Sequence, residues 1–246
     1  MNTKTIITGH SSGLGKALAG HYLQAGCSVL GLARRQVHLM PSEKLVQQQI
    51  DLGDGTALTA WLAGGFLERF IEGAGEIILI NNAAAVAPNA VAGRQQAAEI
   101  AAAVPLNITA PMLLANHLIA CKPEGAVLKI AHIGSGAGRN AYPGWSVYGA
   151  AKAALDHHAR CIAAEQHPRV KIASIAPGVV DTAMQGEIRR AHQADFPMVQ
   201  RFLDLKSEGG LSSPEAAAAE IAGMIASGSF GEEVIDDVRR LREGVK

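Results

Sequence analysis

The stretch TIITGHSSGLG, residues 5–15, decides the fold of this chain. It joins a short β-branched apolar run to a glycine-rich turn and then to a helix-forming segment. Glycines in such a turn let the backbone bend tightly towards a phosphate, and the free amides at the start of the helix face the negative charge. Because ordinary strand-to-helix turns also use glycine, the turn indicates a nucleotide site only through its position after the first strand.

The same alternation of strand and helix continues along the chain. Near-continuous apolar runs, which are typical of strands buried on both faces, predict strands at residues 5–8, 28–33, 46–50, 77–81, 127–133, 170–175 and 234–235. Helical spacing of apolar residues predicts helices at residues 14–24, 56–70, 97–120, 146–166 and 214–225. This order predicts one α/β domain over residues 1–246, a Rossmann-type doubly wound parallel sheet of about seven strands with helices on both faces.

Residues 179–210 break the alternation. This segment is richer in charge, Gln and His, and it falls between the end of a strand and the last helix. Ligands of open α/β sheets bind outside the carboxyl ends of the strands. The segment is therefore either a substrate-covering element or a surface excursion, and the sequence leaves both open.

Composition narrows the function classes. Lys plus Arg equals Asp plus Glu at 22 each, so no basic field attracts nucleic acid or anionic lipid. We find no signal-peptide pattern and no uninterrupted apolar run of membrane-spanning length. The three cysteines match no redox or metal pattern, and the adjacent His157 and His158 face different directions on a helix. We expect a cytoplasmic protein without metal, nucleic-acid or membrane partners.

The cofactor is indicated by two features. The turn has the spacing GxxxGxG, formed by Gly9, Gly13 and Gly15. The second predicted strand ends in Arg34 and Arg35, where an acid would bind ribose hydroxyls and a cation would pair with a 2′-phosphate. The alternative is a solvated arginine pair, but after a phosphate-binding turn the pair favours NADP over NAD.

Catalysis is indicated by Tyr148 and Lys152, which lie four residues apart and share a helix face. A neighbouring ammonium favours the phenolate and lowers the pKa of a tyrosine towards the working range of an acid–base catalyst. Such a pair also occurs by chance. It gains weight because Ser135 follows the 127–133 strand, Asn107 lies in a predicted helix, and the motifs NNAA and PGVVDT begin at residues 81 and 177.

In order and spacing, these motifs resemble the classical short-chain dehydrogenase/reductase family over nearly the whole chain. The resemblance implies that Tyr148 protonates the carbonyl oxygen and that Lys152 lowers the pKa of Tyr148 and holds the nicotinamide ribose. It implies that Ser135 orients the carbonyl and that Asn107 supports a water behind Lys152. A homodimer or homotetramer acting on a small-molecule carbonyl compound is also implied.

The same resemblance implies an NADP(H) site. The residues that it assigns to this site are Gly9, Ser11, Ser12, Gly13, Leu14, Gly15, Arg34, Arg35, Asp51, Leu52, Asn82, Ala83, Tyr148, Lys152, Pro177, Gly178, Val180 and Thr182. Three positions depart from the family pattern. Ser12 stands where NADP-preferring members often have a basic residue, Ala84 replaces a usual Gly, and Gly134 replaces a frequent Ser.

Residues 144–154, 176–185 and 210–215 more closely resemble sepiapterin and benzil reductases. Sepiapterin reductases anchor their pterin with an aspartate near the C-terminus; the equivalent position here is Ile235, with Asp236 one place on. Strand side chains alternate between faces, so we expect Asp236 to point away from the site. We therefore expect a diketone or another hydrophobic carbonyl, with a sepiapterin-type pterin reductase as the alternative.

Trp145 and Met184 are candidate substrate-pocket residues. Phe196, Met198 and Phe202 are either further pocket residues or lid and subunit contacts. A non-catalytic NADP-binding sensor on the same fold is a competing hypothesis, and NAD-dependent alcohol oxidation is a third, which Arg34 and Arg35 disfavour.

Overall fold

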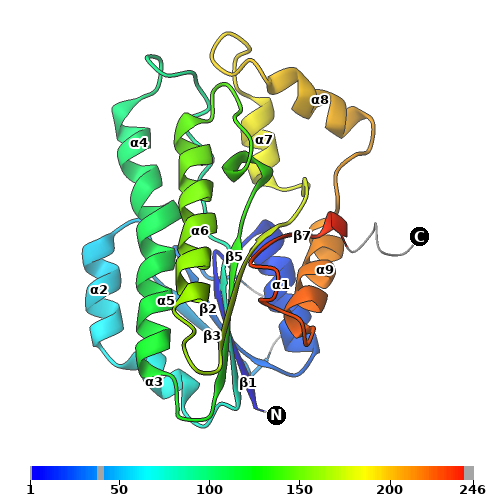
Figure 1. Cartoon of the computed structure of the whole chain (residues 1–246). Helices are drawn as coiled ribbons and strands as arrows, with labels where there is room; N and C mark the ends of the chain where they lie inside the picture. Colours follow the sequence, from blue (N-terminus) through cyan, green and yellow to red (C-terminus); the bar gives the residue numbers. More distant parts are fainter. Residues whose placement is uncertain (1, 38–41, 241–246) are drawn as a thin grey trace.

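A computed structural model of the chain describes residues 2–37 and 42–240. In this part of the chain, seven parallel strands form one sheet in the order β3-β2-β1-β4-β5-β6-β7 (Figure 1). The strands are β1 (Thr3–Thr8), β2 (Ser28–Ala33), β3 (Leu45–Gln49), β4 (Glu76–Asn81), β5 (Val127–Ile133), β6 (Val170–Ala176) and β7 (Ile235–Asp237). The predicted Rossmann-type sheet is confirmed.

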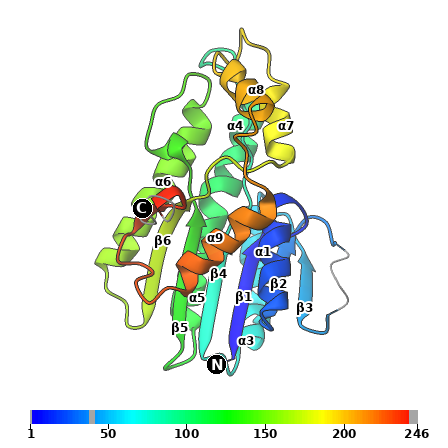
Figure 2. The same ribbon diagram turned by 90° about the vertical axis from the view of Figure 1, so that its right-hand side faces the viewer.

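Helices cover both faces of this sheet. Successive side chains of a strand point to opposite faces, so Ile6 packs against one helix layer and Ile7 against the other. The layers are visible on either side of the sheet in Figures 1 and 2. One layer contains α2 (Gly55–Ala63), α3 (Phe66–Ile71), α5 (Ala110–Cys121) and α6 (Ser146–Ala164), and the other contains α1 (Gly13–Gln24) and α9 (Pro214–Ala226).

Two predicted helices differ in detail. The 56–70 helix is divided at Gly65, whose φ of +67° suits glycine and not a helix interior. The 97–120 helix starts as α4 (Ala97–Val104) and continues through a π-helical turn, η1 (Pro105–Thr109), into α5. Pro105 has no N–H to donate to the preceding turn, and a π-turn absorbs this break without ending the helix.

The continuous helix over 97–121 is, among the described helices, the one that is long and apolar enough to cross a membrane by length and composition alone. This is weak evidence, because core helices of soluble proteins meet the same criterion. Ala110, Leu114 and Leu118 pack the α5 part of this helix onto the sheet, and 28% of its most apolar stretch is buried.

Residues 179–210 contain two short helices that helical spacing did not predict, α7 (Ala183–Arg189) and α8 (Val199–Ser207). They lie beyond the carboxyl ends of the strands, at the top of Figures 1 and 2. A bridge between Val180 and Ser212 closes the segment at its base, where the Asp181 amide donates to the Ser212 carbonyl at 2.9 Å.

Candidate active site

A cavity of about 980 Å³ opens at the carboxyl edge of the sheet. The ends of the neighbouring strands β1 and β4 form part of it. From this pair the chain adds strands β2 and β3 on one side and β5 to β7 on the other. Open α/β sheets bind ligands at such a reversal of strand order. The predicted site residues in its wall are Gly9, Ser11, Ser12, Gly13, Leu14, Arg34, Arg35, Asp51, Leu52, Asn82, Ala83, Ser135, Trp145, Tyr148, Lys152, Pro177, Gly178, Val180, Thr182 and Met184. Gly15 and Asn107 lie behind this wall.

The turn after β1 is packed backbone against backbone. A Cβ atom at Gly15 would lie 2.3 Å from the Gly9 carbonyl oxygen and 2.5 Å from Asn82 Nδ2, so residue 15 must be glycine. The Thr8 hydroxyl accepts hydrogen bonds from the amides of Asn82 at 2.8 Å and Ala83 at 2.9 Å, which fixes the turn to the end of β4. Ser12 begins α1 without a side-chain cap, so the first helix amides are available to a phosphate.

His10, in the same turn, has a structural position. Its ring is fully buried against Gly31, where an added Cβ would lie 2.3 Å from the ring. His10 Nε2 lies 2.8 Å from Gln47 Oε1. The ring therefore joins the turn to β2 and β3, contacts that the sequence alone did not indicate.

The rim of the cavity at the end of β2 is cationic. Arg34 and Arg35 are both exposed and both contribute to the cavity wall. Asp51 Oδ1 accepts the Gly53 amide at 2.9 Å, so this carboxylate shapes the adjacent loop, and Leu52 is buried beside it.

Ser135, Tyr148 and Lys152 meet in the cavity wall from two elements. Ser135 follows β5 and begins the 3-10 turn η2 (Gly136–Gly138), and the other two lie one turn apart near the start of α6. Burial raises the pKa of Tyr148, and a hydrogen bond with the Ser135 side chain opposes that rise. Lys152 Nζ donates to the Ile133 carbonyl at 2.7 Å and lies 5.6 Å from the centroid of the Tyr148 ring. The lowering of the Tyr148 pKa by Lys152, which the family resemblance implies, stays a prediction.

Lys152 is itself buried. Burial lowers its pKa to about 8, and the nearby Asp156 carboxylate opposes this change. The side chain therefore gains or loses its proton just above neutral pH, close to the range in which an acid–base catalyst works.

Asn107 lies in the π-helical turn η1 and is buried. Its Oδ1 accepts the Ala85 amide and its Nδ2 donates to the Ala85 carbonyl, both at 2.8 Å. The side chain thus fixes the segment after β4, behind the cavity wall, and its role in proton relay stays a prediction.

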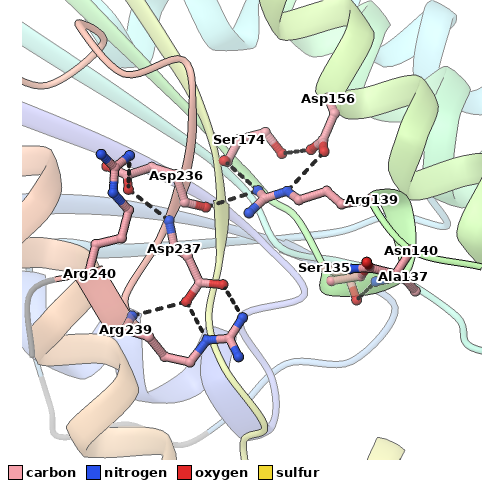
Figure 3. Close-up of polar contacts among 11 residues, drawn as sticks. Ser135, Ala137, Arg139, Asn140, Asp156, Ser174, Asp236, Asp237, Arg239 and Arg240 are labelled. Atoms are coloured by element: carbon pink, nitrogen blue, oxygen red, sulfur yellow. Dashed lines mark hydrogen bonds and ion pairs between the residues drawn. The ribbon is translucent and has the colours of Figure 1, made fainter. Parts of the chain in front are cut away.

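Sequence reasoning missed a partly buried polar network behind the cavity (Figure 3). Arg139 Nε and Asp156 Oδ2 form an ion pair at 3.2 Å, and the Ser174 hydroxyl donates to Asp156 Oδ1 at 2.6 Å. Arg139 also donates to the carbonyls of Ser174 at 3.2 Å and Asp236 at 2.9 Å. The network joins the Ser135 loop to α6, β6 and β7. One signal was present: Asp156 follows Lys152 by four residues and therefore shares its helix face.

This network explains one departure from the family pattern. A Cβ at Gly134 would lie 2.7 Å from Ser174 Oγ and 3.5 Å from Asp156 Oδ1. The space that a serine would need at residue 134 is thus occupied by the Ser174 hydroxyl. The second departure, Ala84, is accommodated because it is not among the non-glycine residues with positive φ.

Aromatic rings gather over the catalytic side chains. Trp145 lies between Phe196, Phe202 and Tyr148, with ring centroids 5.0, 5.1 and 5.2 Å away. Trp145, Met184 and Phe202 contribute to the cavity wall. Phe196 is fully buried in this aromatic cluster. Of the two alternatives for this residue, it therefore packs the covering segment and does not line the pocket.

The C-terminal strand places a different aspartate at the cavity from the one considered in the sequence. Asp236 lies outside the cavity wall, as the alternation of side chains along a strand predicted. The next residue, Asp237, lies in the wall. Although burial opposes the change, hydrogen bonds from Arg239 lower the pKa of Asp237. The Arg239 guanidinium donates to both carboxylate oxygens, at 2.8 and 2.6 Å.

Comparison with known proteins agrees with this geometry. A family model described as short chain dehydrogenase matches residues 3–193. The chain belongs to the short-chain dehydrogenase family and is an oxidoreductase of CH–OH and C=O groups. Members of the family use a nicotinamide cofactor.

Individual relatives narrow the resemblance. A benzil reductase ((S)-benzoin forming) of Bacillus cereus is 35% identical, over 94% of this chain and 97% of its own length. A sepiapterin reductase of Meriones unguiculatus is 29% identical, over 92% of each chain. The crystal structure of a short-chain dehydrogenase/reductase from Burkholderia vietnamiensis is 37% identical, with a TM-score of 0.71 over 98% of both chains.

Proposed function

We propose that this protein is an NADPH-dependent reductase of hydrophobic diketones and related aromatic ketones. The observation that carries the proposal is one cavity in which Ser135, Tyr148 and Lys152 lie beneath the aromatic side chains of Trp145 and Phe202. Polar groups that position a carbonyl and rings that pack against aryl groups are what such a substrate requires. The 35% identity to a benzil reductase supports the same substrate class.

The chain's own residues divide the work. Tyr148 donates a proton to the carbonyl oxygen, and Ser135 donates a hydrogen bond that orients this oxygen. Lys152, in its protonated form, stabilises the phenolate left on Tyr148. Trp145 and Phe202 hold the aryl groups and exclude water. The nicotinamide, when bound, supplies the hydride.

The proposed preference for NADPH is supported by the rim of the cavity. In the turn after β1, glycine lets the backbone segments approach closely, and the first backbone amides of α1 have no side-chain cap. Both features suit the binding of a pyrophosphate. Arg34 and Arg35 are exposed at the end of β2, where cations pair with a 2′-phosphate.

A pterin substrate is the second candidate, favoured by Asp237 in the cavity wall. Its carboxylate is already paired with Arg239, so a pterin would have to compete with a guanidinium. This competition makes a diketone the better-supported substrate.

The test is to follow the oxidation of NADPH and of NADH with benzil, simple aromatic ketones and sepiapterin. We expect turnover of benzil with NADPH, a lower kcat/KM with NADH, and a loss of about 10³-fold in Tyr148→Phe, within the range for removal of a general acid. Efficient reduction of sepiapterin that Asp237→Asn abolishes would favour the pterin reductase. Tight NADPH binding without turnover of any carbonyl would favour a sensor and overturn the proposal.

A further inference from the structure

Three potential metal ligands meet far from the cavity, where α3 lies beside the end of α5 (Figure 1). Glu68, His117 and Cys121 each offer one ligand atom, and these atoms all lie within 4.8 Å of one another. His117 and Cys121 are four residues apart on α5 and share a face, and Glu68 comes from α3. β4 and β5 begin a few residues beyond these helices, so the group lies at the amino edge of the sheet, opposite the cavity.

The contacts within this group leave ligand atoms unsatisfied. His117 Nε2 and Glu68 Oε1 are 2.9 Å apart. However, this contact lacks the direction of a hydrogen bond, and both His117 Nε2 and Glu68 Oε2 are buried without a hydrogen-bond partner among the described residues. Leaving buried polar atoms unpaired is costly. An ordinary His–Glu hydrogen bond therefore does not account for the arrangement.

The chemistry of the three ligands selects a class of ion. Thiolate, imidazole and carboxylate are the ligands of zinc, and three protein ligands with one open position form a common zinc site. Mg²⁺ prefers oxygen ligands alone. When an ion binds, the proton of the Cys121 thiol is released to solvent.

We propose that Glu68, His117 and Cys121 bind one zinc-class divalent ion, which ties α3 to the end of α5. The partial exposure of His117 and Glu68, 22% and 39% of their side chains, gives an ion access from solvent. The site is separate from catalysis, because the three residues, all in the described part of the chain, lie outside the cavity wall.

Zn²⁺ titration of the tag-free protein against a chromophoric chelator, together with thermal melting, tests this proposal. We expect one Zn²⁺ per chain and a melting temperature that rises with Zn²⁺ but not with Mg²⁺. Loss of an outer-shell partner of a metal ligand costs 10–100-fold in affinity, so we expect His117→Ala and Cys121→Ser to weaken binding at least about 100-fold. Melting of the metal-free variants checks that they fold.

Helix α6 provides a matched control. His157 and Cys161 have the same four-residue spacing, both are exposed, and in the described residues they have no third ligand nearby. The double variant His157→Ala/Cys161→Ser is expected to bind Zn²⁺ like the wild type. Absence of stoichiometric binding would overturn the proposal, as would binding that survives both α5 substitutions or disappears with the α6 pair.

Discussion

The floor and the roof of the cavity are built from different interactions. The floor comprises the turn after β1, the ends of β4 and β5, and the start of α6. The roof comprises residues 183–207, that is, α7, α8 and the segment between them. In the floor, backbone meets backbone at Gly15, and a partly buried ion pair joins Arg139 to Asp156 behind the catalytic side chains. In the roof, apolar packing dominates, with Phe196 and Phe202 against Trp145.

This difference indicates where amino-acid substitutions are tolerated. Directional polar contacts and close backbone approaches fail when atoms move by fractions of an ångström, whereas apolar cores accept swaps of similar volume at a cost below about 1.5 kcal/mol. The floor should therefore determine whether the reaction occurs at all. The roof should determine which carbonyl compounds are reduced.

The largest effect is expected from Gly15→Ala in the floor. The added methyl would overlap the Gly9 carbonyl, at 2.3 Å, and force the phosphate-binding turn open. Because misplacement of about 1 Å costs about 10²-fold in rate, we expect kcat/KM to fall at least about 100-fold and NADPH binding, measured by fluorescence titration, to weaken. Gly20→Ala on α1 is the control, since nothing lies within 4 Å of its added Cβ. Equal activity of the two variants would show that the turn tolerates a side chain.

Asp156→Asn tests the network behind the floor. The variant keeps the shape but removes the charge that pairs with Arg139. Breaking a buried ion pair costs about 3–5 kcal/mol, and because the Arg139 side chain is 25% exposed we expect about 2 kcal/mol by urea unfolding. Asp195→Asn, in an exposed ion pair with Arg94, should change stability by less than about 1 kcal/mol.

The same variant makes a prediction about pH. Burial lowers the pKa of Lys152 to about 8, and Asp156 opposes this, so loss of the carboxylate moves this pKa further down. Reduction uses the protonated form of Lys152. The rate of reduction is therefore maximal below the pKa of Lys152 and falls as the pH rises through this pKa. We expect the alkaline limb of kcat/KM near pH 8 in the wild type and at lower pH in Asp156→Asn. Coincident limbs would show that Asp156 does not influence Lys152.

The contrast between floor and roof also separates what the sequence could predict from what it could not. Strand positions follow from local apolar patterns, and the fold was confirmed. The grouping of Ser135, Tyr148 and Lys152 in one site was implied by the resemblance of the motifs to a known family. Helices α7 and α8 span only 7 and 9 residues, which is shorter than the stretch of about 11–18 residues over which helical spacing is recognised. Contacts such as Arg139 with Asp156 or His10 with Gln47 join residues distant in sequence, and only the folded chain reveals them.

Gly134→Ser is expected to have a moderate effect, because its Cβ would lie 2.7 Å from Ser174 Oγ. Overpacking a buried site costs about 1–3 kcal/mol of stability. A small shift of the Ser135 loop should lower kcat/KM roughly tenfold, less than the loss of about 10²-fold for a displacement of about 1 Å. Adding Ser174→Ala removes the overlap and leaves the new hydroxyl near Asp156. We expect the double variant to recover most of the activity. A double variant no better than the single one would mean that residue 134 acts through contacts other than Ser174.

The smallest effects are expected in the roof, from the pair Phe202→Leu and Phe196→Leu. Both rings pack against Trp145, but Phe202 also lies in the cavity wall, whereas Phe196 is fully buried. We expect each variant to lose roughly 1–2 kcal/mol of stability, measured by urea unfolding, because leucine leaves part of the volume of the phenylalanine ring empty. Only Phe202→Leu should raise KM for benzil, by a few-fold, with kcat unchanged, because it removes binding that ground and transition states share. A fall in kcat for either variant would show that the roof also positions Tyr148, and the division between floor and roof would then fail.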